Sequence, residues 1–149
     1  LNRIKREFEA ERDEKHETEQ VYENDNRNID DYFMRNKIIK YINENYYRDI
    51  SLKSLSKELN YNQAYLGRLF NRLMGRSFRD YLKFYRIKKA VDMIKDGKHK
   101  IYEVAEIVGY KDINYFCIIF KEFMGMTPSE YKTESENWPP VDPLHKNEV

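Results

Sequence analysis

The chain has 149 residues, of which 36% are charged, and a formal net charge of +1. This length allows one domain with extensions or two very small units. One cysteine excludes a disulfide framework and a cysteine-based zinc site. No apolar run approaches the roughly 20 residues of a membrane-spanning helix. We therefore expect a soluble, cytoplasmic protein, and the first residue, Leu1 rather than Met, suggests a fragment of a longer one.

The charge is segregated along the chain. Residues 1–36 hold 7 basic and 11 acidic side chains, whereas residues 37–132 hold 19 basic and 11 acidic ones. Residues 133–149 are acidic again, with 1 basic and 4 acidic side chains. A clustered positive field attracts polyanions, although a solvated lysine-rich surface is the plainer alternative.

The first 36 residues divide into two parts. Leu1, Ile4 and Phe8 begin a helical stripe that the charged residues after them do not continue, so residues 1–28 are expected to form an exposed helix or a charged linker. Residues 1–36 as a whole are expected to be an acidic helical extension or linker, and a homodimer is expected through this extension or through a missing upstream domain. From Ile29 the apolar spacing predicts a helix over about residues 30–46. The apolar positions that predict it are Tyr32, Phe33, Ile38, Ile39 and Ile42.

Three helices are predicted between residues 51 and 96. Ser51 is expected to cap a short helix that Asn60 ends, and Asn62 to cap the next one, which Gly75 ends in a left-handed conformation. A longer helix follows Ser77 and stops at Asp96-Gly97. The side chains expected to face inward in the second of these helices are Tyr65, Leu66, Leu69, Phe70 and Leu73.

The second half of the chain repeats the first. The positions in the earlier copy are Leu52, Leu55, Ser56, Leu59, Asn60, Tyr61, Tyr65, Leu66, Leu69, Phe70, Gly75 and Tyr81. The first six recur 49 residues later and the other six 50 residues later, as Ile101, Val104, Ala105, Val108, Gly109, Tyr110, Tyr115, Phe116, Ile119, Phe120, Gly125 and Tyr131. Agreement at twelve positions predicts a pseudo-symmetric pair of modules.

Each copy reads as a short helix, a tight turn and a longer helix, which is the layout of a helix-turn-helix. An ordinary helical hairpin is the alternative, but two copies in one basic block favour a motif that places its second helix in the DNA major groove. The joining helix, from Ser77 to Ile94, has about 18 residues and spans roughly 27 Å. Successive major-groove segments recur about every 34 Å, so a monomer is expected to span two of them.

Residues from about Ile38 to Lys132 resemble the DNA-binding domain of the AraC/XylS family of transcription regulators. The resemblance is carried by residues 109–121, by Gly125-Met126-Thr127-Pro128 with Tyr131, by residues 65–70 and by residues 86–90. It implies an all-α fold with two helix-turn-helix subdomains joined by a long linker helix, preceded here by a charged helical extension. The implied function is promoter binding over residues 37–132, with RNA polymerase as a partner, and residues 133–149 are expected to be an irregular tail.

The second helix of each module, which would enter the major groove, is the reading helix of that module. In the first module it is expected to turn Gln63, Ala64, Gly67, Arg68 and Asn71 outward, and Arg72 is a candidate phosphate anchor. The resemblance places base contacts at Ala64, Gly67 and Arg68. The Arg68 guanidinium is expected to donate two hydrogen bonds to guanine O6 and N7. The alternative is an ion pair within the protein or a contact with a DNA phosphate. Gly67 departs from the family pattern because it has no side chain that could contact a base. Either the backbone comes close to DNA there, or this module recognises little beyond what Arg68 contacts.

The second reading helix is expected to start at Asp112, its N-cap, and to expose Ile113, Asn114, Cys117, Ile118 and Lys121. Family members often carry a basic or polar reader where this chain has Ile118. Ile113 and Ile118 can meet thymine methyl groups, and Asn114 is the only strong hydrogen-bonding reader. Because Asn114 is the only such reader, this module is expected to act mainly through DNA shape and phosphates. The alternative for Ile118 is core packing.

Nothing in the sequence predicts an enzyme, a metal site or a cofactor. The three histidines are far apart, no glycine-rich phosphate loop occurs, and Cys117 reads as an inert thiol. The thirteen tyrosines read mostly as core side chains rather than as a base-stacking surface. The competing function is a helical protein-protein interaction module that uses the same basic face.

Overall fold

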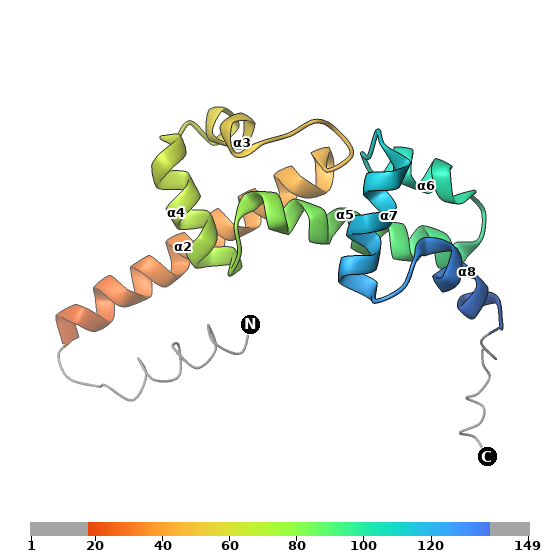
Figure 1. Ribbon diagram of the computed structural model, residues 1–149. Coiled ribbons are helices and arrows are strands. Elements are labelled where there is room, and N and C mark those ends of the chain that lie inside the picture. The colour runs from red at the N-terminus through yellow and green to blue at the C-terminus, as the bar shows by residue number, and fades with distance from the viewer. Residues whose placement is uncertain (1–17, 138–149) are drawn as a thin grey trace, which may run out of the picture. The chain divides into compact units, whose positions relative to one another are not determined.

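The computed structural model describes residues 18–137, with side chains from residue 26 onward, and this range forms seven α-helices and no β-strand (Figure 1). The prediction of an all-α fold with two helix-turn-helix subdomains and a linker helix is confirmed. The helices are α2 (Thr18–Asn45), α3 (Leu52–Leu59), α4 (Gln63–Met74), α5 (Phe78–Asp96), α6 (Ile101–Ile107), α7 (Ile113–Met124) and α8 (Pro128–Asn137).

The chain divides into two compact units. The first combines the described residues up to Glu44 with Ser51–Phe78, and therefore contains α3 and α4. The second combines Asn45–Ile50 with the described residues from Arg79 onward, and therefore contains most of α5 together with α6, α7 and α8. Each unit holds one copy of the repeated module.

The core of the first unit is built from the apolar periodicity of three helices. Ile38 and Ile42 lie one turn apart on α2 and are fully buried, as is Leu55 on α3. The buried residues of α4 are Leu66, Leu69, Phe70 and Leu73. A hydrogen bond from the Tyr41 hydroxyl to Ser54 Oγ, 3.0 Å long, also ties α2 to α3. The second half of α2 is thereby fixed to the first module.

The second unit has one continuous hydrophobic cluster. Its buried members come from α5, α6, α7 and the turn between the last two helices: Ile87, Ala90, Ile94, Val104, Ala105, Val108, Tyr110, Phe116, Ile119 and Phe120. Tyr46 and Tyr131 are partly buried against it. The linker helix therefore contributes its apolar face to the second module.

The repeat that the sequence predicts is confirmed in the backbone. Both α4 and α7 have 12 residues, and they begin 50 residues apart, after the N-caps Asn62 and Asp112. Both end at a left-handed glycine, Gly75 with φ 76° and Gly125 with φ 77°. The two reading helices are thus equivalent in length, in capping and in register.

The first helix differs from the prediction at its start. It begins at Thr18 rather than near Asp30, so residues 18–28 take the helical form that the sequence left open beside a charged linker, and Glu19, Glu23 and Arg27 are good helix formers within them. Tyr32 and Phe33, expected as part of the apolar stripe, are 64% and 58% exposed, and Ile29 beside them is 52% exposed. The stripe expected at Leu1, Ile4 and Phe8 lies outside the described residues.

The tail also differs from the prediction. Residues 133–149 were expected to be irregular, but α8 continues to Asn137. Pro128 occupies the first position of this helix, where its missing N–H costs nothing, and Thr127 Oγ1 accepts a hydrogen bond from the Glu130 amide at 3.2 Å. The first five residues of the predicted tail therefore extend a well-capped helix.

The expectation that the tyrosines fill the core is wrong for half of the twelve whose side chains the structure describes, whereas Tyr46 and Tyr131 do pack against the core of the second unit. Only Tyr110 is buried, whereas the exposed ones are Tyr32, Tyr47, Tyr61, Tyr65, Tyr102 and Tyr115. Tyr65, expected to face inward, instead stacks on Tyr61 with a ring separation of 5.9 Å. Tyrosine fits such positions because its ring packs while its hydroxyl stays hydrated.

Among the described helices, none has the length and apolar character to cross a membrane.

Candidate nucleic-acid interface

The turn before each reading helix sets the angle at which that helix leaves the module. In the first module Asn60 adopts a left-handed conformation with φ 59°, and the Tyr61 amide donates to the Ser56 carbonyl at 2.9 Å. In the second module Gly109 has φ 105°, and the Tyr110 amide donates to the Ala105 carbonyl at 2.8 Å. In both modules, an equivalent backbone hydrogen bond therefore ends the helix that precedes the turn, as the repeat predicts.

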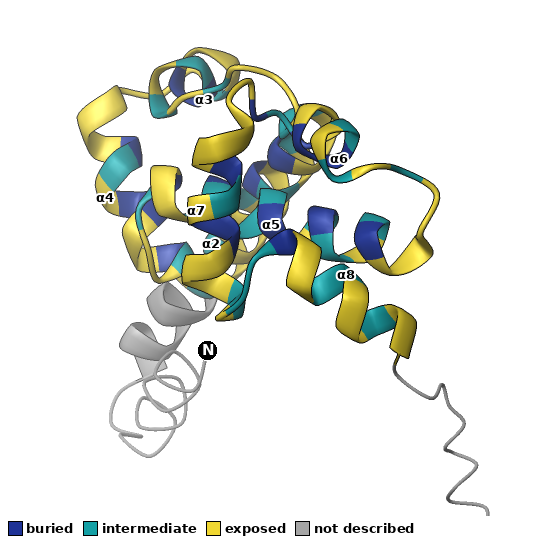
Figure 2. Cartoon of the chain, turned by 45° about the vertical axis from the view of Figure 1, so that its right-hand side comes forward, coloured by how far each residue is buried: buried dark blue, intermediate teal, exposed yellow. Residues whose placement is uncertain are grey.

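The reading helix α4 separates its core face from an exposed face (Figure 2). Gln63, Ala64 and Arg68 are all exposed, opposite the buried Leu66 and Phe70. Among the residues that the structure describes, Arg68 has no hydrogen-bond or ion-pair partner. Within residues 26–137, the ion pair that the sequence left open for Arg68 is therefore not formed, and the side chain is exposed.

Gly67 has a structural explanation. A Cβ atom at this position would lie 3.1 Å from Leu52 Cδ2, which is tighter than an ordinary van der Waals contact. The missing side chain thus lets α3 pack closely on α4. Gly67 is half-buried against its own module, so a close approach of DNA is not needed to explain the glycine.

Two residues of α4 that were predicted to contact DNA, the outward-facing Asn71 and the phosphate anchor Arg72, make other contacts. The Asn71 side chain donates to the Gly67 carbonyl of its own helix at 3.1 Å. Arg72 donates twice to Asp31 on α2, at 2.6 and 3.0 Å, and these bonds raise the pKa of the guanidinium. The sequence carries no signal for this pair, because its members lie 41 residues apart. Arg72 thus holds the extension helix onto the first module.

The reading helix α7 presents a different surface. Phe116, Ile119 and Phe120 fill the core side, whereas Ile113 is 39% exposed and Ile118 is 58% exposed. Core packing, the alternative for Ile118, is therefore wrong. Asn114 and Lys121 are exposed beside them. The outer side of α7 consequently combines apolar side chains with one amide and one cation.

Asp112 and Cys117 belong to the framework of α7 rather than to its outer face. Asp112 Oδ1 accepts the Asn114 amide at 2.8 Å and the Tyr115 amide at 3.3 Å, which confirms the predicted N-cap. These amides are then not available to a phosphate. Cys117 packs partly against the hydrophobic cluster, and burial raises the pKa of its thiol, which stays neutral at pH 7.

Arg86 is a positioning residue to which the sequence analysis assigned no role. Its Nε donates to the Tyr46 carbonyl and its Nη2 to the Arg48 carbonyl, both at 2.7 Å, and its guanidinium lies 5.4 Å from the centre of the Tyr110 ring. Burial lowers the pKa of this arginine. One α5 side chain therefore ties the segment after α2 to the turn before α7.

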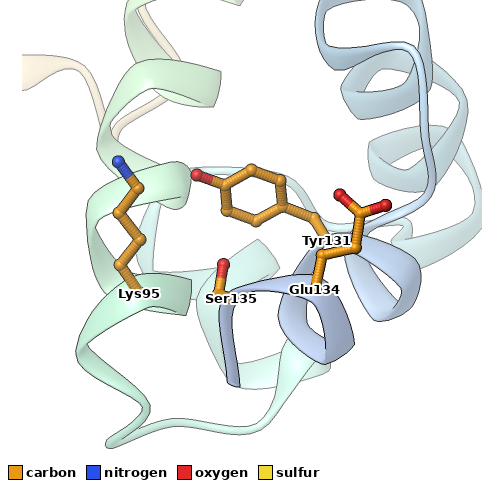
Figure 3. A pocket seen from close by; sticks show the side chains of 4 residues that line it. All are labelled: Lys95, Tyr131, Glu134 and Ser135. Carbon is orange, nitrogen blue, oxygen red and sulfur yellow. The ribbon is translucent and has the colours of Figure 1, made fainter. Parts of the chain in front are cut away.

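The second unit also has a hollow of about 370 Å³ between α5 and α8, lined by Lys95, Tyr131, Glu134 and Ser135 (Figure 3). Lys95 and Tyr131 turn their polar ends toward one another, whereas the Glu134 carboxylate points away. No residue of either reading helix lines it. In the described part of the chain, no group of three or more His, Cys, Asp or Glu side chains is arranged to hold a metal ion.

Comparison with known proteins places these features in a family. A family model described as a helix-turn-helix domain matches residues 55–134. An uncharacterized response regulatory protein of Staphylococcus epidermidis is 34% identical over 107 residues, which cover 72% of this chain and 42% of that protein. The transcriptional regulatory protein HptR of Staphylococcus aureus is 31% identical over 68% of this chain and 40% of its own length.

The fold is shared with solved structures as well. The C-terminal domain of the two-component response regulator yesN from Fusobacterium nucleatum is 35% identical, with a TM-score of 0.64, and the match covers 66% of this chain and 97% of that domain. The chain spans about two-fifths of the length of the curated relatives it matches.

Proposed function

Because the chain belongs to the AraC-type helix-turn-helix family of DNA-binding transcription regulators, we propose that it binds promoter DNA sequence-specifically by inserting α4 and α7 into successive major-groove segments. The observation that carries this proposal is the equivalence of the two helices. They share a length of 12 residues, the same caps and a register of 50 residues, and each turns a solvated face outward from its own core.

In this proposal, the side chains on the exposed faces of α4 and α7 contact different groups of the DNA. On α4, Arg68 matches the two acceptors of guanine, Gln63 matches adenine, and Ala64 suits a thymine methyl group. On α7, Asn114 offers hydrogen bonds to adenine, and Lys121 a charge to the phosphates. Asn71 and Arg72 take no base in this proposal, because α4 and α2 already occupy them.

The linker helix supports binding by a single copy. The 19 residues of α5 span about 28 Å, which is close to the roughly 34 Å between successive major-groove segments on one side of B-DNA. The net positive charge of residues 37–132 favours a polyanionic ligand over this same region.

A titration of labelled duplexes across salt concentrations tests the proposal. Duplexes selected from a random pool should bind more tightly than random ones, with an affinity that falls steeply with salt and a log–log slope of several units. A flat salt response without sequence preference contradicts promoter binding and favours the protein-interaction alternative.

The variant Arg68→Ala refines this test. We expect it to weaken binding by roughly 1–3 kcal/mol and to relax the preference at one base position, because one bidentate base contact is lost. Arg35→Ala, which removes an exposed arginine of α2, is the matched control and should leave the preferred sequence unchanged. A loss that is uniform over all sequences identifies Arg68 as a phosphate contact instead.

A second copy of the chain is the partner that α2 suits. Ile29, Tyr32 and Phe33 lie at positions i, i+3 and i+4 and are all more than half exposed, whereas Asp31 and Ile38 face the module. Three such side chains supply only a part of the roughly 800 Å² that each partner contributes to a stable interface. The pairing is therefore weak and needs two copies bound side by side on one duplex.

Binding to a duplex with two adjacent sites tests this pairing. The wild-type chain should bind it cooperatively, and Phe33→Glu should remove the cooperativity while single-site affinity stays the same. Equal cooperativity in both proteins contradicts pairing through α2.

A promoter-binding role also requires RNA polymerase as a further partner for transcription. The same role places the protein in the cytoplasm.

A further inference from the structure

The outer face of α7 carries two large apolar side chains that its own module does not bury. Ile113 and Ile118 are 39% and 58% exposed in a chain of which 36% of the residues are charged. The core side of the helix is already filled by Phe116 and Phe120, both fully buried. Two exposed isoleucines on a helix whose core face is complete are available for contact with something outside the module.

The register of the repeat says where on the helix these side chains stand. Ile118 lies 50 residues after Arg68, and Ile113 lies 50 residues after Gln63. Because the two helices have equal lengths and equivalent caps, Ile118 occupies on α7 the place that Arg68 occupies on α4. The apolar pair therefore stands on the reading face itself.

The surroundings of the pair favour DNA over a protein partner. Lys111 and Lys121 are exposed near the two ends of the outer face, and Asn114 is exposed between them. Two acidic side chains lie near the pair: the Asp112 carboxylate caps the helix, and the exposed Glu122 lies one turn after Ile118, toward the end of α7. Two apolar side chains flanked by cations suit a ligand that carries negative charges at its edges and an apolar group between them.

Only one group in the major groove meets that description. Guanine, cytosine and adenine present hydrogen-bond donors and acceptors there, whereas thymine adds its C5 methyl group. An isoleucine side chain has no donor or acceptor, and it therefore gains only from the methyl. We propose that α7 selects its half-site by contact of Ile113 and Ile118 with the 5-methyl groups of pyrimidines, an inference that rests on the proposed DNA-binding function.

The test changes only the methyl groups. In a duplex selected by the wild-type chain, each thymine of the half-site footprinted with α7 is replaced in turn by deoxyuridine, which keeps every hydrogen bond. We expect about fourfold weaker binding at one or two positions, the factor for one buried methyl-sized group. At the same positions, 5-methylcytosine opposite guanine should bind several-fold better than plain cytosine.

Protein variants assign the effect to the two side chains. In Ile118→Ala and Ile113→Ala, duplexes with thymine and deoxyuridine should bind with nearly equal affinity at the affected position. Gln63→Ala, on the equivalent position of α4, is the matched control and should keep the full difference. Because all three residues are exposed, these variants are expected to keep the fold.

The outcomes separate the two levels of the proposal. If the chain binds no duplex with a steep salt dependence, the proposed function itself is wrong. If it binds duplexes but deoxyuridine has no effect at any position, methyl reading is wrong while DNA binding stands. If the isoleucine variants keep the methyl effect and instead lose affinity for a protein such as RNA polymerase or a second copy, the apolar pair is a protein contact and the inference is overturned.

Discussion

The Arg86 guanidinium lies between the turn that precedes α7 and the segment that follows α2. It reaches two backbone carbonyls at 2.7 Å and stacks on Tyr110, and its Cζ would lie only 3.0 Å from a Cβ atom at Gly109. A partly buried cation of this kind is stable because carbonyl oxygens replace part of its water. The absence of a side chain at residue 109 is thus required twice, by φ 105° and by the arginine.

The variant Gly109→Ala should show this double requirement. We expect a loss of more than about 2 kcal/mol in the free energy of unfolding, because backbone strain and a clash with Arg86 add. Gly75→Ala is the matched control, since Gly75 also has positive φ but has no atom within 4 Å of an added Cβ, so strain alone should cost about 1–2 kcal/mol. Urea unfolding measures both, and equal losses contradict a role for the Arg86 contact.

Tyr110 offers a second test at this scale. Its hydroxyl is buried without a hydrogen-bond partner among the described residues, and burial raises its pKa to about 12. Tyr110→Phe should therefore raise the free energy of unfolding by about 1 kcal/mol at pH 7, since the ring and its contact with Arg86 are kept.

The pH dependence of the same variant has a definite sign. The unfolded tyrosine loses its proton near its ordinary pKa of 10.0, before the folded one does near 12, so the wild-type chain loses stability as the pH rises from 10 to 12. Tyr110→Phe should lose less over this range, and Tyr102→Phe, which changes an exposed tyrosine, should follow the wild type. Parallel curves for all three proteins contradict the buried hydroxyl.

At the scale of elements, α2 is held to the first module by two kinds of contact. Ile38 and Ile42 enter the core near its C-terminal end, and the forked bond between Asp31 and Arg72 holds the preceding turns against α4. The exposed pair adds at most about 1 kcal/mol to stability, but it fixes the direction of the helix. A movement of α2 would therefore disturb the reading helix α4.

Replacing Arg72 by alanine separates its two possible roles. We expect faster hydrogen exchange over residues 26–36, because Asp31 loses its partner, and an unchanged salt slope of DNA binding. A phosphate anchor instead lowers that slope by about 1. Asp31→Asn, which keeps Arg72 but weakens the pair, should reproduce the exchange effect, and a failure to do so contradicts the assignment.

At the scale of the molecule, the proposal requires both modules to act on one duplex. Inserting five base pairs between the two half-sites moves them to opposite sides of the helix, and we expect the affinity to fall to that of a single module. Inserting ten base pairs restores the side but exceeds the reach of α5, so affinity should stay low. Unchanged binding to the five-base-pair duplex indicates that only one module reads DNA.

Much of this organisation is readable in the sequence because it depends on neighbours along the chain. Helix caps at Asn62 and Asp112, left-handed ends at Gly75 and Gly125, and the register between α4 and α7 all follow from local propensity and periodicity. The same reasoning identified most of the exposed residues of both reading helices, but it placed Gly67 and Cys117 outward although both are partly buried. It misplaced Tyr65, because a residue beside the apolar stripe can pack on a neighbouring turn while staying exposed.

Side-chain partners distant in sequence were decided by tertiary structure alone. The choice of Asp31 for Arg72, the use of Arg86 to hold the segment around Tyr46, and the packing of Leu52 over Gly67 each join residues that no local pattern relates. The physical reason is that hydrogen bonds and close packing depend on positions in space, whereas propensity and periodicity describe only the order of residues along one helix.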